Sequence, residues 1–387
     1  MPWQHVPDAG PPHHMIFERR YQTFLSACQD IVRRRERLAK PVIGDLLLQE
    51  VDASVPNHAL ISHIMAEALL RRIDRNLVEA KNIYLQRFEI SQIDLFYLMT
   101  KGNPLVAESH RIANQLLASE LRKHKHAVLV DIGIGKGIQI EALLLRLTQD
   151  SGDLTSLTIV AIDPNSDNLI HAKDRLVASP ASGKFDLRVQ THQGLIEDLT
   201  ESDLRSFTAD LPAVRIINSA YTLHHTMHGT GDTQRRGQIL RMVASAWQPV
   251  LFTLVEPNAD HDTENLPKRL HQCWEHFGTT FEMVDEAPID PVQKFLIKEQ
   301  FFGREIRDIF GVSDTFRCER HEPIDTWLLR LTKAGLQPLS LHLNEPTFLP
   351  VYCTLVQSEG LVRLGYRGHP LIAVYAYGTP MQKDGSR

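Results

Sequence analysis

The stretch that decides the fold is Val128-Leu-Val-Asp131-Ile-Gly133-Ile-Gly135-Lys-Gly137-Ile-Gln-Ile-Glu141-Ala-Leu. The residues before Gly133 are apolar except for Asp131, which is typical of a parallel strand covered on both faces. Glycines then alternate along a turn, where they let a backbone or a ligand approach closely. An apolar helix follows from about Ile138, with its free N–H groups aimed back at the turn. This order predicts the cofactor site of a doubly wound α/β fold.

The glycine spacing indicates the class of cofactor. A dinucleotide fingerprint, G-x-G-x-x-G, counted from Gly133 would require a glycine at position 138, which is Ile138. The pattern Asp131-x-Gly133-x-Gly135-x-Gly137 instead resembles motif I of methyltransferases that use S-adenosyl-L-methionine (SAM). A nicotinamide-dependent oxidoreductase therefore remains only a distant alternative.

A second strand is expected over residues 157–162, and it ends in Asp163-Pro164-Asn165. An acidic side chain at the end of the second strand can bind both ribose hydroxyls of an adenosine. The alternative is that Asp163 simply caps a helix. Together with the glycine pattern, Asp163 favours SAM as the cofactor.

Composition excludes several partners. The chain of 387 residues is 43% hydrophobic and 23% charged, as expected of a soluble globular protein. Its net charge of −5 predicts neither a nucleic-acid partner nor an anionic membrane partner, and no apolar run is long enough to span a bilayer.

The four cysteines are far apart and form no C-x-x-C pair, which favours a reducing, cytoplasmic location.

The order of helical and strand patterns predicts an α/β fold with a mainly parallel sheet and a helical cap subdomain. The cap could instead be a stabilising bundle or a homodimer interface. Within the last part of the sheet we expect a strand at 338–343, a helix at 347–357 and a hairpin of 361–366 with 370–377. The expected parts are a flexible N-terminal arm (1–14), the helical cap (15–122), a Rossmann-like SAM-binding core (123–257), a helical insertion joining the cap (258–335), the C-terminal part of the core sheet (336–379) and a flexible tail (380–387).

Further along the chain, segments in a fixed order resemble the GRAS domain over most of residues 41–379. This family is known mainly from plant transcriptional regulators and is also found in bacteria. The resembling segments are Val128-Leu-Val-Asp131-Ile with Gly137-Ile-Gln139, Asn218-Ser-Ala-Tyr-Thr-Leu223-His224-His225, Leu254-Val-Glu256-Pro-Asn-Ala-Asp-His261, Arg317-Cys-Glu319-Arg320-His321-Glu322 followed by Trp327, and Leu364-Gly-Tyr366-Arg-Gly-His-Pro370.

The resemblance implies a Rossmann-like methyltransferase core with a seven-stranded sheet in the order 3-2-1-4-5-7-6. The plant members act as regulators and as platforms for protein interaction, and many have an eroded glycine loop. This chain keeps Gly133, Gly135 and Gly137 in the loop, has Asp163, and carries Tyr366 where the family usually has Trp. These departures resemble a bacterial-type member and favour a cofactor-binding enzyme.

Several residues are assigned to the methionine part of SAM. Gly133, Gly135 and Gly137 would let the backbone approach it, and Asp131 would face its ammonium group. Asn218, at the end of the fourth expected strand, would border the transferred methyl group.

The nucleoside part of SAM has its own expected contacts. Asp163 would accept the ribose hydroxyls. Gln193, or its neighbour His192, lies where the adenine would sit, just past the third expected strand.

Catalysis requires a proton acceptor if the methyl acceptor is a hydroxyl or an amine. His224 or His225 could be that base, because a neutral imidazole accepts a proton near pH 7. Glu256, at the end of the fifth expected strand, is the second candidate. The alternatives are that the histidines only form hydrogen bonds in a loop and that Glu256 pairs with Arg320.

Three residues are expected to contact the substrate, namely Tyr221, Asn258 and Arg320. Arg320 could pair with a carboxylate substrate, although a structural ion-pair network around it is the other interpretation. No metal site is predicted, because His225 and His228 are three residues apart but have no partner ligands at a recognisable spacing.

The leading prediction is therefore a GRAS-like SAM-dependent methyltransferase that acts on a small-molecule acceptor. The alternative is a non-catalytic GRAS regulatory protein that binds a small ligand or a protein partner.

Overall fold

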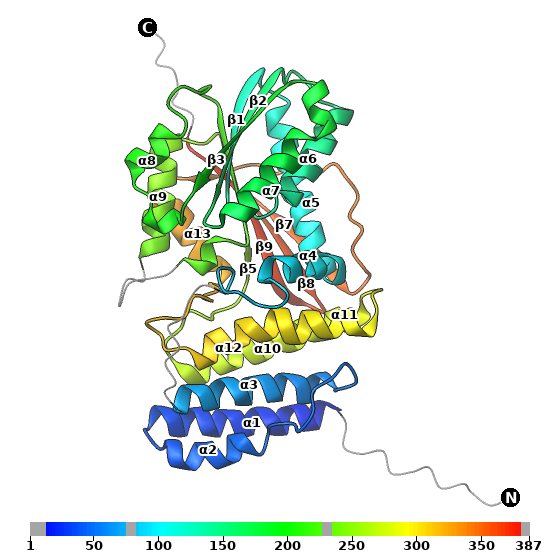
Figure 1. Ribbon diagram of the computed structural model, residues 1–387, viewed down its shortest axis with the longest axis vertical. Coiled ribbons are helices and arrows are strands. Elements are labelled where there is room, and N and C mark those ends of the chain that lie inside the picture. Colours follow the sequence, from blue (N-terminus) through cyan, green and yellow to red (C-terminus); the bar gives the residue numbers. More distant parts are fainter. Residues whose placement is uncertain (1–12, 75–82, 227–233, 381–387) are drawn as a thin grey trace, which may run out of the picture. The chain divides into compact units, whose positions relative to one another are not determined.

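The computed structural model describes residues 13–74, 83–226 and 234–380 (Figure 1). Contacts divide the chain into two compact units, each built from two separate segments. Unit 1 comprises Met1–Ala80 and His261–Arg317, and unit 2 comprises Lys81–Asp260 and Cys318–Arg387. Most of the expected flexible arm (1–14) and tail (380–387) lies outside the described residues. In the described ranges, no helix combines the length and the apolar character that a membrane crossing requires.

Within residues 13–74 and 261–317, unit 1 is helical wherever it has regular structure. Helices from its two segments pack on each other, α12 against α3 and α10 against α1. Asn265 starts α10 by accepting a hydrogen bond from the backbone N–H of Lys268, and a proline occupies the first turn. The elements are α1 (His13–Val32), α2 (Glu36–Gly44), α3 (Asn57–Ile73), α10 (Leu266–Glu286), α11 (Pro291–Phe295), the π-helix η4 (Leu296–Phe302) and α12 (Gly303–Gly311).

Asp314 links the two segments of unit 1. Its carboxylate accepts hydrogen bonds from Arg72 Nη2 at 2.8 Å and Arg317 Nε at 3.0 Å, and it also pairs with Arg269. The guanidinium of Arg269 is fully buried and also donates to the carbonyl of Ile309. These cations hold the pKa of Asp314 well below its usual range, although burial opposes the shift.

Unit 2 contains one mixed sheet in the order β3-β2-β1-β4-β5-β9-β8-β7, with β6 also paired to β9. Neighbouring strands from β3 to β5 are parallel, whereas every pairing of β6, β7, β8 and β9 is antiparallel. The strands are β1 (His126–Ile132), β2 (Ser156–Asp163), β3 (Asp186–Gln193), β4 (Arg215–Ala220), β5 (Leu251–Pro257), β6 (Gln337–Pro338), β7 (Cys353–Ser358), β8 (Leu361–Tyr366) and β9 (His369–Gly378).

Helices lie on both sides of this sheet, with α5, α6 and α7 on one side and α8, α9 and α13 on the other (Figure 1). α5 packs on α6 and on strands β4, β5 and β9. α4 and α5 thus belong to unit 2, whereas the sequence analysis grouped residues 15–122 in one cap. The elements are α4 (Gln92–Gly102), α5 (Pro104–Leu121), α6 (Ile138–Gln149), α7 (Ser166–Val177), α8 (Glu201–Ser206), α9 (Arg235–Trp247), α13 (Ile324–Lys333) and the short 3-10 turns η1 (Pro180–Gly183), η2 (Ile196–Asp198) and η3 (Leu223–His225).

The expected α/β class and the order of the parallel strands are confirmed, but a mainly parallel seven-stranded sheet is wrong. The described residues form nine strands, and β9 runs antiparallel between β5 and β8. The helix expected at 347–357 is also wrong, because Cys353–Ser358 pairs along its whole length with β8 as strand β7. The strand expected at 338–343 is reduced to Gln337–Pro338, while the hairpin of β8 and β9 is confirmed.

Asp314→Asn should destabilise unit 1, because the buried guanidinium of Arg269 loses its anionic partner. We expect the free energy of unfolding to fall by about 2 kcal/mol. Denaturant unfolding followed by circular dichroism measures the change. The control is Asp74→Asn, which removes an exposed pair with Lys40 and should cost less than about 1 kcal/mol. Equal losses in the two variants would contradict a special role for Asp314.

Candidate functional site

A pocket of about 400 Å³ lies in unit 2 at the carboxyl ends of β1, β2 and β4. This edge of a parallel sheet is where doubly wound folds bind ligands, and the volume is within the range of small-molecule sites. Among the described residues that line it, five were predicted from the sequence, namely Gly133, Gly135, Asp163, Tyr221 and His225.

The glycine loop forms one wall of the pocket, and its backbone requires glycine. Gly133, Gly135 and Gly137 have φ values of 80°, 53° and 76°. A Cβ atom at Gly133 would lie 2.1 Å from Thr222 Oγ1, and one at Gly137 would lie 3.1 Å from Ala172 of α7. Gly133 therefore allows the loop to approach the segment after β4, whereas Gly137 allows α6 to approach α7.

Asp163 fixes the glycine loop from the end of β2. Its Oδ2 accepts the N–H of Gly135 at 3.0 Å, and its Oδ1 accepts the N–H of Asn165 at 2.9 Å and Nδ2 of Asn168 at 3.2 Å. Burial raises the pKa of Asp163, and these donors oppose the shift. Asn165, not Asp163, is the N-cap of α7, so the alternative that Asp163 caps this helix is wrong. Binding of ribose hydroxyls by Asp163 stays a prediction, for which a carboxylate has further lone pairs.

Asp131 lies in a buried polar chain that leads to the pocket. Its Oδ1 accepts Asn218 Nδ2 at 3.1 Å, and the same amide is 3.3 Å from Gln139 Oε1. Gln139 and Asn114 contact each other and line the pocket. Burial raises the pKa of Asp131 to about 7, although the hydrogen bond from Asn218 opposes the shift. Asp131 and Asn218 therefore reach the pocket through Gln139.

Aromatic rings from α4 and α5 also line the pocket. The rings of Phe96 and His110 lie 5.7 Å and 5.5 Å from that of Tyr221, and the Tyr97 hydroxyl accepts the N–H of Lys136 at 2.7 Å. Tyr221 has a φ of 55°, an uncommon value for a residue with a side chain that is often found at functional sites. Its hydroxyl is 2.8 Å from Ser109 Oγ.

The candidate bases occupy two different environments. His224 and Glu256 are buried, and His224 Nδ1 lies 2.5 Å from Glu256 Oε2. Glu256 Oε1 also accepts the N–H of Leu223 at 2.9 Å. Burial raises the pKa of Glu256 to about 8, although the nearby Arg236 opposes the shift. His225, in contrast, lines the pocket and packs against the Tyr84 ring, with a centroid distance of 4.7 Å.

Several other predicted residues are not among the described residues that line the pocket. They have structural contacts elsewhere in unit 2. Gln193 is exposed and donates to the carbonyl of Pro164, and its neighbour His192 stacks on Phe207. Asn258 donates to the carbonyl of Pro370 and accepts the N–H of Ile324. Arg320 is buried in the segment that follows Arg317.

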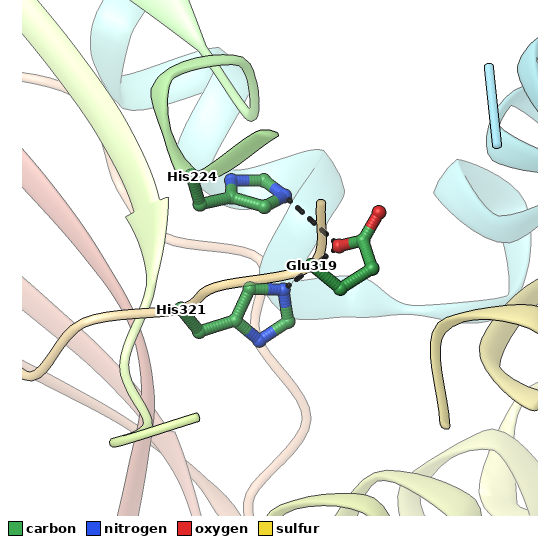
Figure 2. A group of neighbouring side chains, drawn as sticks. All are labelled: His224, Glu319 and His321. Carbon is green, nitrogen blue, oxygen red and sulfur yellow. Dashed lines mark ion pairs between the residues drawn. The ribbon is translucent and has the colours of Figure 1, made fainter. Parts of the chain in front are cut away.

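Glu319 lies between two histidines in a cluster that was not predicted from the sequence (Figure 2). His224 comes from η3, whereas Glu319 and His321 come from the segment before α13. The ligand-type atoms of these buried residues lie within 4.8 Å of one another. The pair considered from the sequence was His225 with His228, and His228 lies outside the described residues. In the sequence, Glu319 and His321 are separated only by Arg320, which is a spacing typical of ligands on one extended segment. This motif lies far along the chain from His224.

A model of the GRAS domain family matches residues 21–370. This chain belongs to the GRAS domain family. Among curated relatives of this GRAS protein, DELLA protein GAIP of Cucurbita maxima is 25% identical over 87% of this chain and 59% of its own length. DELLA protein RGL3 of Arabidopsis thaliana is 24% identical over 91% of this chain and 68% of its own length. The chain therefore spans roughly three fifths to two thirds of these relatives.

Solved structures include the same fold. SCL7 of Oryza sativa matches with a TM-score of 0.74 and 20% identity, covering 92% of this chain and 99% of that chain. At this identity the match shows a shared GRAS fold and no more.

The buried carboxyl of Asp131 should make stability depend on pH. Its folded pKa of about 7 lies above the unfolded value of about 3.9. Below about pH 4 the carboxyl is protonated in both states and does not reduce the stability of the fold. Above about pH 7 it is ionised in both states, and burying its charge reduces stability by the full amount. Asp131→Asn cannot ionise, and its stability relative to the natural protein should rise by at most about 4 kcal/mol across that interval. Denaturant titrations across that interval measure the difference. A constant difference would mean that Asp131 is already ionised in the acidic range.

Proposed function

We propose that this GRAS-domain protein binds a small adenosine-containing ligand, SAM or S-adenosylhomocysteine, in the pocket of unit 2. We further propose that it acts as a non-catalytic regulatory protein, for which the ligand is a signal or a structural component. The observation that carries the proposal is that the glycine loop and Asp163 line the pocket, whereas His224 and Glu256 are engaged with each other.

The ligand-binding part rests on the chemistry of the pocket walls. The Asp163 carboxylate suits the ribose hydroxyls, and the glycine at position 135 leaves the loop backbone accessible from the pocket. The rings of Phe96 and Tyr221 offer flat apolar contacts for a purine. The amide of Gln139, tied to Asp131 through Asn218, offers a polar contact for the amino-acid end of the ligand.

The regulatory part rests on the state of the candidate bases and on the family. A base must reach the proton that it removes. The His224 ring contacts Glu256 through Nδ1, and its Nε2 faces Glu319 at 3.8 Å. The resemblance to plant GRAS regulators supports the same interpretation, with protein partners added to the small ligand.

Titration calorimetry with SAM and with S-adenosylhomocysteine tests the binding site. We expect micromolar binding that Asp163→Asn weakens at least tenfold, because the amide replaces an acceptor of ribose hydroxyls with a partial donor. The control is Asp167→Asn, an exposed residue at the start of α7. Circular dichroism checks that both variants are folded. Failure of the natural protein to bind either ligand would overturn the proposed site.

Methyl transfer is a second candidate function, because His225 is a candidate base that does line the pocket. The assay measures S-adenosylhomocysteine formed from labelled SAM in the presence of a small-molecule cell extract. Under the leading proposal, formation stays at background in both the natural protein and His225→Asn. Product formation that His225→Asn abolishes, with SAM binding unchanged, would support the enzyme instead.

A further inference from the structure

The cluster around Glu319 combines residue types that bind transition metals. His224 belongs to η3, and Glu319 and His321 belong to the segment between Cys318 and α13, so tertiary folding brings them together within unit 2. All three residues are at most 3% exposed. Two imidazoles with one carboxylate form a donor set typical of zinc, iron or nickel sites.

The two distances from Glu319 Oε2 to the imidazole nitrogens are closer to those between ligands of one ion than to a hydrogen bond. Glu319 Oε2 lies 3.8 Å from His224 Nε2 and 3.6 Å from His321 Nε2. A hydrogen bond between such atoms would normally be shorter than about 3.2 Å. Adjacent ligands of a tetrahedral zinc ion, with bonds of about 2.0–2.1 Å, lie roughly 3.3–3.4 Å apart. Figure 2 shows the carboxylate oxygen facing both ring nitrogens.

Glu256 orients the His224 ring as an outer partner of a metal ligand does. Its Oε2 lies 2.5 Å from His224 Nδ1, and its Oε1 is held by the N–H of Leu223. When the N–H at Nδ1 donates a hydrogen bond to Glu256, Nε2 is unprotonated and directs its lone pair toward Glu319. Carboxylate–histidine pairs of this kind fix the tautomer and the orientation of metal-binding histidines.

Charge also favours a cation at this position. Glu319 is fully buried, and a buried carboxylate requires positive charge close by. Arg236 directs Nη1 to Glu322 at 3.1 Å and donates to the carbonyls of Leu223 and His224. Arg330 also pairs with Glu322. A divalent ion between the two Nε2 atoms and Oε2 would place positive charge directly beside Glu319.

We propose that His224, Glu319 and His321 bind one divalent transition-metal ion, with Zn²⁺ as the preferred ion. His225 is the neighbouring side chain for the fourth coordination position, since its Nδ1 lies 3.0 Å from Glu319 Oε1. Because His225 also lines the pocket, the ion would stabilise one of the pocket walls. The competing arrangement places a proton, instead of an ion, between the imidazoles and Glu319.

Metal binding by the full chain tests the proposal directly. The purified protein is stripped with a chelator and titrated with Zn²⁺ against a chromophoric competitor, and separately with Co²⁺ while visible absorption is recorded. We expect about one ion per chain, the intense visible bands of four-coordinate Co²⁺ and a Tm that rises with Zn²⁺ concentration. These measurements on the natural protein do not depend on any variant being stable.

Variants then locate the ion. Glu319→Gln and His321→Gln should each weaken Zn²⁺ binding by more than about tenfold, and Glu256→Gln by roughly 10- to 100-fold through the outer contact. His171→Gln, at an exposed position on α7, is the control for binding to surface histidines and should leave the affinity unchanged. Circular dichroism excludes unfolded samples.

Two results would overturn the proposal. One is a stripped protein that binds neither Zn²⁺ nor Co²⁺, which would leave a proton as the bridge. The other is metal binding that Glu319→Gln and His321→Gln leave intact while His171→Gln reduces it. Either result is independent of SAM binding. His321→Gln should leave SAM binding intact, because His321 is not among the described residues that line the pocket.

Discussion

The arrangement of the pocket depends on one buried carboxylate. Asp163 ends β2, holds the glycine loop through the N–H of Gly135 and holds the start of α7 through Asn165 and Asn168. A buried carboxylate with these donors fixes three backbone segments at once, since losing any donor leaves charge without compensation. Gly135, whose φ is positive, presents its N–H to this carboxylate, and both residues line the pocket.

Sequence patterns identified the parallel half of the sheet because its signals are local. The apolar runs that became β1 and β2 end at Gly133 and Asp163, residues that interrupt the strand pattern within a few positions. In the antiparallel half, β7, β8 and β9 follow one another through tight turns, whereas β9 pairs with the distant β5. Cys353–Ser358 contains the β-branched Thr354 and Val356 and is joined to β8 by the turn Glu359-Gly360, local strand signals that the predicted helix overlooked. The grouping of α5 with the sheet likewise depends on tertiary packing.

The candidate site divides in the same way. Gly133, Asp163 and His225 were found because each follows the end of a predicted strand. Tyr97 and His110 line the pocket from α4 and α5, where nothing in the local sequence distinguishes them from ordinary core residues. Glu319 was noticed only as part of a charged motif. Its position between His224 and His321 depends on the fold, which no spacing along the chain encodes.

The position of β9 has a consequence for folding during synthesis. β9 pairs with β5, yet the segment His261–Arg317, which belongs to the other unit, is made between them. The edge of β5 must therefore remain without its final neighbour while the second segment of unit 1 is translated. Such delayed, non-local pairing slows folding and leaves an exposed strand edge open to aggregation. Chaperone supply and expression temperature should therefore change the yield of folded protein more than they change the stability of the folded state.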